Sequence, residues 1–177
     1  MNCQVAFVIG DSVKIGQATP LSSEDLAAGK ALTIPGAPNA RYAWDAGEAI
    51  GRYLEELKNG RIVGRVCRRC KRTMVPPRMF CELCHRPTDA WARVQDSGRV
   101  NTFSICHVSW DVKRLATPQI PAVIELDGAS PGMGILHLLG EVRPPDVKIG
   151  MRVQAVWKRE AGRVGAVTDI LYFKPVA

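Results

Sequence analysis

The stretch from Cys67 to Cys84, CRRCKRTMVPPRMFCELC, contains two Cys-x-x-Cys pairs separated by ten residues. Each such turn presents two thiolates to one ion, and two turns complete the tetrahedral shell of a structural zinc site. Cys67, Cys70, Cys81 and Cys84 are therefore the predicted zinc ligands, with iron or a redox dithiol as the alternatives. The spacer is shorter than in many zinc ribbons but suits a tight rubredoxin-like hairpin with VPP at its far end.

The other cysteines and the histidines carry no comparable pattern. Cys3 and Cys106 are isolated, so each is interpreted as an idle or buried thiol, and the paired cysteines favour metal over disulfides in a reducing compartment. His85 follows a complete ligand set and is expected outside it. His107 and His137 fall in predicted strands, where a structural role is the simpler interpretation. No sequence signature pairs these histidines with a nucleophile.

The net charge of +7 is concentrated around the cysteine segment. Residues 61–93 contain nine basic and two acidic side chains, whereas the rest of the chain has 15 of each. A zinc ion with four thiolates is itself negatively charged, and nearby Arg and Lys help to offset that charge. The metal centre therefore explains part of the basic excess without any partner.

Residues 1–43 are predicted to form an N-terminal extension that orders only against a partner. The extension holds a short apolar segment from Val5 to Ile9 and a possible short helix in SSEDLAAGKA. The spacing of Ser22 and Asp25 allows a capping box at the start of that helix.

The sequence contains neither a spanning segment nor the features of a signal peptide. No apolar run reaches the length of about 18 residues that a membrane helix needs. The first residues, MNCQVAFVIGDSV, lack a basic region before the apolar core and a small-residue cleavage pattern. These observations predict a cytoplasmic protein without membrane contact.

Residues 44–60 are predicted to form an amphipathic helix ahead of a zinc ribbon over residues 61–90. Asp45 can serve as the N-cap, Glu48 suits the positive end of the helix dipole, and Gly60 ends the helix. The apolar side consists of Ala49, Ile50, Tyr53, Leu54 and Leu57. This stripe indicates core packing, and a partner surface is the alternative because a small metal module has little core to offer.

Residues 91–177 have the pattern of a β-barrel. WARVQDSGRVNTFSICHVSW predicts a hairpin with its turn at Asp96-Ser97-Gly98. Four further segments, IPAVIELDGA, GMGILHLLGEV, MRVQAVWKRE and VGAVTDILYFK, are rich in Val, Ile, Leu and aromatics and bounded by Gly, Pro or Asp. A mainly β protein ending in a five-stranded OB-fold fits this size, because closure removes exposed edges. The apolar interior predicts no polar ligand inside the barrel.

The order of these parts resembles the acyl-CoA-associated family of zinc-ribbon plus OB-fold proteins, long catalogued as a domain of unknown function. The resemblance covers about Trp44 to Val176. It rests on GRIVGRVCRRC, MVPPRMFCELC, WARVQDSGRVNTFS and IPAVIELD taken together. The segment before Ala43 lies outside it.

The resemblance implies a non-catalytic subunit of a hetero-oligomer built on a thiolase dimer. Family members assemble with thiolase-type enzymes, with related condensing enzymes and with some enoyl-CoA hydratases. The partner would then hold the nucleophilic cysteine and most of the coenzyme A thioester site, with acyl-CoA allowed at the junction. The zinc would be structural.

A nucleic-acid-binding module is the competing hypothesis, because zinc ribbons and OB-folds both serve that role. An OB-fold that binds single strands combines aromatic stacking platforms with a basic groove. Residues 94–177 have ten basic and eight acidic side chains, and their aromatics do not alternate with cations except near Trp157. The sequence therefore favours the acyl-CoA association.

Overall fold

The computed structural model describes residues 4–9, 12–17, 22–30, 45–109 and 111–176. These residues belong to two compact units, Met1–Ala43 and Trp44–Ala177. No helix in the described ranges is both long enough and apolar enough to cross a membrane.

The first unit contains a strand pair and a short helix. Strand β1 (Gln4–Ile9) includes the apolar segment noted in the sequence and pairs antiparallel with β2 (Ser12–Gln17). Helix α1 spans Ser23–Ala27. Its capping box forms as predicted: the Asp25 N–H donates to Ser22 Oγ at 3.0 Å, and the Ser22 N–H donates to the Asp25 carboxylate at 3.3 Å.

The second unit begins with helix α2 (Gly47–Lys58). The predicted N-cap was wrong by one residue, because Ala46 occupies that position and the Asp45 carboxylate instead accepts a hydrogen bond from the Gly47 N–H at 3.0 Å. The apolar stripe is confirmed as core packing for Ala49, Tyr53 and Leu57, which are buried, whereas Ile50 is exposed.

A three-stranded antiparallel sheet follows, with the order β4-β3-β5. It comprises β3 (Ile62–Cys67), β4 (Arg72–Met74) and β5 (Ala90–Val94). The predicted hairpin around residues 96–98 was wrong, since β5 pairs with β3. The reason is non-local: the Gln95 N–H donates to the Asp127 carbonyl, and the Asp96 carbonyl accepts from the Ala155 N–H, so this turn is held by the barrel.

Five strands close the barrel that the sequence predicts. They are β6 (Ser97–Phe103), β8 (Arg114–Leu126), β9 (Gly134–Leu139), β10 (Arg152–Trp157) and β11 (Ile170–Pro175). The pairings run β6-β8-β9-β11-β10 and back to β6, with β9 and β11 parallel, which is the connectivity of an OB-fold. At Gly98 an added Cβ would collide with the Glu125 carbonyl, so the β6–β8 approach requires glycine.

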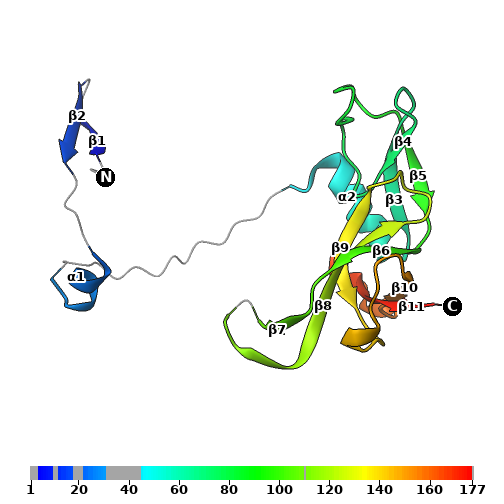
Figure 1. Cartoon of the computed structure of the whole chain (residues 1–177). Helices are drawn as coiled ribbons and strands as arrows, with labels where there is room; N and C mark the ends of the chain where they lie inside the picture. Colours follow the sequence, from blue (N-terminus) through cyan, green and yellow to red (C-terminus); the bar gives the residue numbers. More distant parts are fainter. Residues whose placement is uncertain (1–3, 10–11, 18–21, 31–44, 110, 177) are drawn as a thin grey trace. The chain divides into compact units, whose positions relative to one another are not determined.

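Short elements complete the barrel. Strand β7 (Cys106–Val108) pairs with the first part of β8, and Figure 1 shows the two projecting from the barrel as an arm. Three 3-10 turns lie in the connections: η1 (Pro144–Asp146), η2 (Glu160–Gly162) and η3 (Val167–Asp169).

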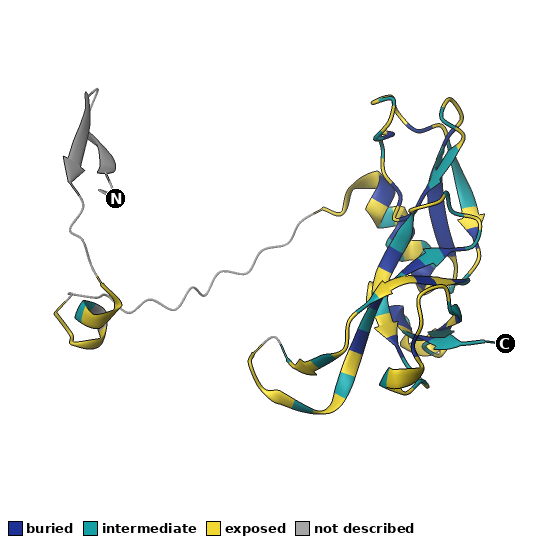
Figure 2. Cartoon of the chain, in the orientation of Figure 1, coloured by how far each residue is buried: buried dark blue, intermediate teal, exposed yellow. Residues whose placement is uncertain are grey.

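One apolar core joins helix, ribbon and barrel. Leu57 of α2, Ile62 of β3 and Phe173 of β11 belong to the same cluster, and Figure 2 shows buried positions along these elements. The barrel interior is apolar as predicted, with one buried carboxylate, Asp169, at its end. Asp169 accepts hydrogen bonds from consecutive backbone N–H groups, so its role is to hold the chain that enters β11.

Candidate metal centre

The fold brings the four predicted cysteines together. Cys67 ends β3, Cys70 completes the turn before β4, and Cys81 and Cys84 form a second turn before β5. All four Sγ atoms lie within 4.8 Å of one another, and Cys67 Sγ is 3.6 Å from Cys84 Sγ. A tetrahedral zinc ion with Zn–S bonds of about 2.3 Å separates its sulfurs by about 3.8 Å. The donor set therefore fits a four-thiolate zinc shell.

The two cysteine turns share one backbone conformation. The residue after the second cysteine of each pair has a left-handed φ, 52° at Lys71 and 54° at His85. Left-handed backbone is costly for residues other than glycine, so its repetition indicates a geometry that the turns require. In the first turn the Cys70 N–H points at Cys67 Sγ, 3.4 Å away. His85 is exposed and, as predicted, is not part of the sulfur cluster.

The sulfurs compete for protons when no cation is bound. The neighbouring Cys84 sulfur, together with burial, raises the pKa of Cys70 to about 12. The Leu83 N–H, helped by the Cys84 N–H, lowers the pKa of Cys81 to about 7 despite burial. Four thiolates at this separation repel one another, and a divalent cation removes that repulsion.

Charged groups around the centre are partly engaged within the ribbon. The Asp89 carboxylate accepts a hydrogen bond from the Arg68 N–H at 2.7 Å and so fixes the first cysteine turn. Arg72 pairs with Glu82 at 3.0 Å, whereas the side chains of Arg68 and Arg69 are exposed. The free positive charge next to the metal site thus lies mainly on those two arginines and their exposed neighbours.

Arg65 has a role that sequence reasoning missed. It is buried, donates to the Thr88 hydroxyl at 2.7 Å and to the Thr88 carbonyl at 2.6 Å, and stacks over the Trp91 ring. Arg52 of α2 lies 4.6 Å from the same ring centre. In β3, Arg65 stands between Gly64 and Val66. This local sequence pattern does not indicate that the Arg65 side chain is buried. Arg65 stabilises the base of the ribbon instead of adding to its basic surface.

No hydrogen bond joins the described histidines and Cys106 to one another. His137 Nδ1 accepts from the Leu138 N–H at 2.9 Å, and Nε2 donates to the Val167 carbonyl at 3.2 Å. Both ring nitrogens of His137 are thus engaged with backbone groups, and its structural role stays a prediction. His107 is exposed, and no hydrogen bond in the described part of the chain joins Cys106 to a histidine. Cys3 lies outside the described residues.

Comparisons with known proteins agree with this architecture. Residues 54–89 match the ChsH2 rubredoxin-like zinc ribbon domain, and residues 91–158 match the ChsH2 C-terminal OB-fold domain. A DUF35 domain-containing scaffold protein of Methanocaldococcus jannaschii is 33% identical over 118 residues, covering 65% of this chain and 82% of that protein. The chain belongs to the DUF35 family. The predicted resemblance is thereby confirmed.

Other DUF35 proteins extend the comparison. A DUF35 scaffold protein of Methanothermobacter thermautotrophicus is 25% identical over 70% of this chain and 92% of its own. A DUF35 crystal structure from Sulfolobus solfataricus, of unknown function, has a TM-score of 0.53 at 25% identity, covering 62% of this chain and 78% of that one. The Ltp2-ChsH2(DUF35) aldolase structure has a TM-score of 0.55 at 22% identity, covering 76% and 98%. This last likeness shows the shared fold.

Proposed function

We propose that this chain is a non-catalytic subunit that assembles with a thiolase-type acyl-CoA enzyme and supports its acyl-CoA chemistry. Cys67, Cys70, Cys81 and Cys84 hold a structural zinc ion that fixes the ribbon. The partner supplies the nucleophile and most of the coenzyme A thioester site. The assembly works in the cytoplasm, where thiols stay reduced.

The observation that carries this proposal is the closed nature of the site. Four sulfurs fill the shell of a zinc ion, so no ligand position is left for substrate. Relatives in two archaea are named scaffold proteins, and a solved relative is named as an Ltp2-ChsH2 aldolase, that is, together with another protein. Thiolase-type and aldolase enzymes both make or break carbon–carbon bonds beside a carbonyl group, which supports a partner from this chemistry.

The contacts of the barrel aromatics argue against the nucleic-acid hypothesis. Trp157 donates from Nε1 to Asp96 at 3.1 Å, and Arg163 lies over its ring at 5.5 Å. Tyr172 donates to Glu141, and Phe173 is fully buried. Trp110 lies outside the described residues. Phe103 is partly buried against the core. Two of the four described barrel aromatics, Phe103 and Phe173, thus pack in the core and Trp157 is covered by Arg163, whereas single-strand binding needs free stacking faces.

Co-expression tests the proposal directly. A tagged full-length chain is purified with an untagged thiolase-type enzyme, and turnover of acyl-CoA is measured for the complex and for each component. We expect both proteins to elute together at a fixed ratio, and the chain alone to be inactive. The Cys106→Ser variant should leave the complex active. Turnover by the isolated chain, or loss of turnover in an intact Cys106→Ser complex, would contradict the proposal.

A further inference from the structure

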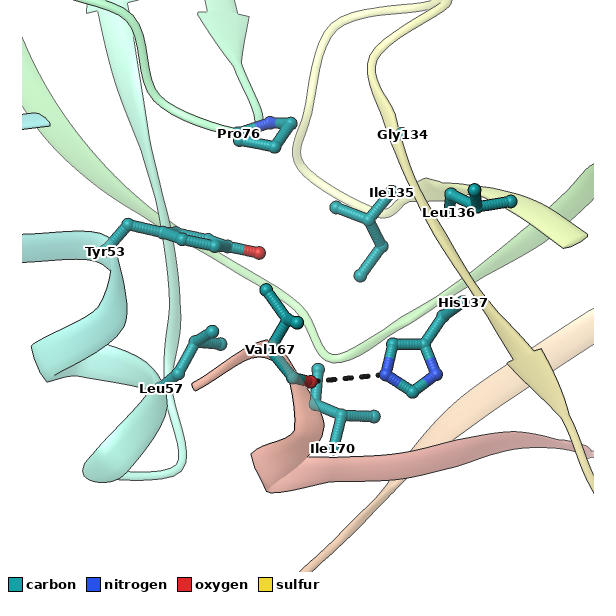
Figure 3. A pocket seen from close by; sticks show the side chains of 9 residues that line it. All are labelled: Tyr53, Leu57, Pro76, Gly134, Ile135, Leu136, His137, Val167 and Ile170. Atoms are coloured by element: carbon teal, nitrogen blue, oxygen red, sulfur yellow. Dashed lines mark hydrogen bonds between the residues drawn. The ribbon is translucent and has the colours of Figure 1, made fainter. Parts of the chain in front are cut away.

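A cavity of about 180 Å³ lies where α2, β9 and the entrance to β11 meet. Helix α2 supplies Tyr53 and Leu57, β9 supplies Ile135, and the chain around η3 supplies Val167 and Ile170 (Figure 3). An apolar cavity of about 150 Å³ engineered into another protein is large enough to bind benzene. The cavity here therefore has room for a ring or a short branched chain.

The cavity adjoins a larger and more open groove of about 500 Å³. Cavity and groove share four wall residues: Leu136, His137, Val167 and Ile170. The groove adds Leu138 and Leu171, and Leu136 is 72% exposed. Apolar side chains of this kind are seldom left in water as a continuous surface unless something binds there.

Tyr53 contributes a hydroxyl group to the cavity wall. Tyr53 is 4% exposed, and Figure 3 shows its hydroxyl oxygen pointing into the space between Ile135 and Val167. Its hydroxyl makes no hydrogen bond to another described residue, and it is not among the fully buried polar atoms that lack a partner, so the oxygen opens onto the cavity. Burial raises the pKa of Tyr53 to about 12, so the hydroxyl keeps its proton at neutral pH and can donate it.

Two other polar side chains nearby, His137 and Lys158, are already engaged, and Thr168 of the groove adds only an exposed, uncharged hydroxyl. Both ring nitrogens of His137 are hydrogen-bonded, as described above. Lys158 at the groove lies 3.7 Å from the buried carboxylate of Asp169. A charged ligand group would lose its hydration in the apolar cavity without finding a free counter-charge, which is unfavourable. The site therefore suits an uncharged molecule.

We propose that the cavity and the groove bind a small, uncharged and mainly apolar molecule whose single carbonyl or ether oxygen accepts a hydrogen bond from Tyr53. Small-molecule sites combine apolar walls with a few placed polar groups, which matches this arrangement. The inference goes beyond the proposed function, because the site is built from this chain alone and requires no partner enzyme.

Two probes of similar size distinguish binding that uses the Tyr53 hydrogen bond from binding that uses apolar contacts alone. Acetophenone carries a carbonyl oxygen, and ethylbenzene does not. Each is titrated into the full-length, zinc-loaded protein while the methyl resonances of Ile135, Val167 and Ile170 are followed by NMR. We expect saturable shifts with both probes. Tyr53→Phe should weaken acetophenone about fivefold, the value of one hydrogen bond, and leave ethylbenzene within about twofold.

A second pair of variants locates the site. Val167 is 57% exposed and borders both the cavity and the groove. Val167→Trp should therefore fill them and abolish binding of both probes. Val164 is 71% exposed and borders neither the cavity nor the groove. Val164→Trp is therefore the matched control and should bind both probes normally. Zinc content and circular dichroism report that each variant is folded.

Three outcomes would overturn the proposal. The first is the absence of saturable shifts with either probe. The second is that Tyr53→Phe changes the affinity for both probes equally, or for neither. The cavity would then be a non-specific apolar void. The third is a response of these resonances to a partner enzyme alone, which would make the groove a protein-docking surface. The first two outcomes leave subunit assembly, measured by co-purification, untouched, whereas the third would itself support assembly.

Discussion

At the scale of single residues, each of the four clustered cysteine sulfurs is one ligand of the proposed zinc ion. Cys70→Ser should lower the zinc content well below one ion per chain and unfold the ribbon, because structural zinc contributes on the order of 10 kcal/mol to folding. Metal analysis of the purified protein, with ribbon amide resonances as the structural readout, measures both effects. Cys106→Ser, which lies outside the cluster, is the control. Iron in the wild type, or full zinc with unchanged stability in Cys70→Ser, would refute the assignment.

A second prediction at this scale concerns Asp127 and the pH dependence of stability. Arg152 donates two hydrogen bonds to this carboxylate, at 2.8 and 2.7 Å, and Ser97 adds a third at 2.6 Å. The Arg152 and Ser97 bonds lower the pKa of Asp127 to about 2 from an ordinary 3.8. A lowered folded-state pKa stabilises the protein above the unfolded value, and that stabilisation is lost as the pH falls from about 4 to about 2.

The Asp127 side chain is 37% exposed, so solvent screening limits its contribution to about 1 kcal/mol. Asp127→Asn should lower the free energy of unfolding by that amount at pH 7, and the difference from wild type should vanish near pH 2. Urea midpoints across this range provide the measurement. Asp146→Asn breaks a more exposed pair with Arg143 and should change little. A deficit in Asp127→Asn that stays constant with pH would contradict the mechanism.

At the scale of elements, the buried apolar face of helix α2 anchors the helix to the core. Leu57 is fully buried in the shared core, whereas Ile50 on the same helix is 38% exposed. Leu57→Ala should lower the free energy of unfolding by about 3 kcal/mol, since a buried leucine loses its contacts and leaves a cavity. Ile50→Ala should cost less than about 1 kcal/mol. Chemical denaturation of the zinc-loaded variants measures both, and similar losses would show that the helix packs differently.

The elements that sequence predicts correctly are those whose signals are local. The stripe through Tyr53 and Leu57 repeats at helical spacing, and the cysteine spacing defines two turns, so both could be found without a structure. The hairpin at residues 96–98 failed because its turn residues bond to Asp127 and Ala155, which are distant in sequence. Strand pairing of this kind depends on tertiary contacts and leaves no mark on the local pattern.

Site features that depend on contacts between distant parts of the chain also could not be predicted from the sequence. The four proposed metal ligands could be named from sequence because two Cys-x-x-Cys pairs are a local signal of a metal site. The burial of Arg65 beneath Trp91 and the hydroxyl of Tyr53 at the cavity wall arise where separate elements meet. Neither residue type nor spacing reports such a junction.

At the scale of the whole molecule, the charge asymmetry seen in the sequence is only partly available to a partner. Arg65 is buried against Thr88, and Arg72 pairs with Glu82. Arg68 and Arg69 remain exposed beside the sulfur cluster. Their charge exceeds the needs of the ribbon itself, so it is suited to an acidic partner surface or to the phosphates of coenzyme A.

The last prediction therefore targets Arg68 and Arg69 together. Replacing both with Ser should weaken assembly with the partner, or raise its KM for acyl-CoA, by up to about thirtyfold at low salt, because exposed ion pairs contribute up to about 1 kcal/mol each. Moderate salt should have the same effect on the wild type, since it screens these charges. Lys148→Ser with Arg159→Ser removes two exposed charges from the barrel and serves as the control. Complex affinity and acyl-CoA kinetics are measured at two salt concentrations. If both stay at wild-type values while binding of single-stranded RNA collapses, the basic face serves nucleic acid.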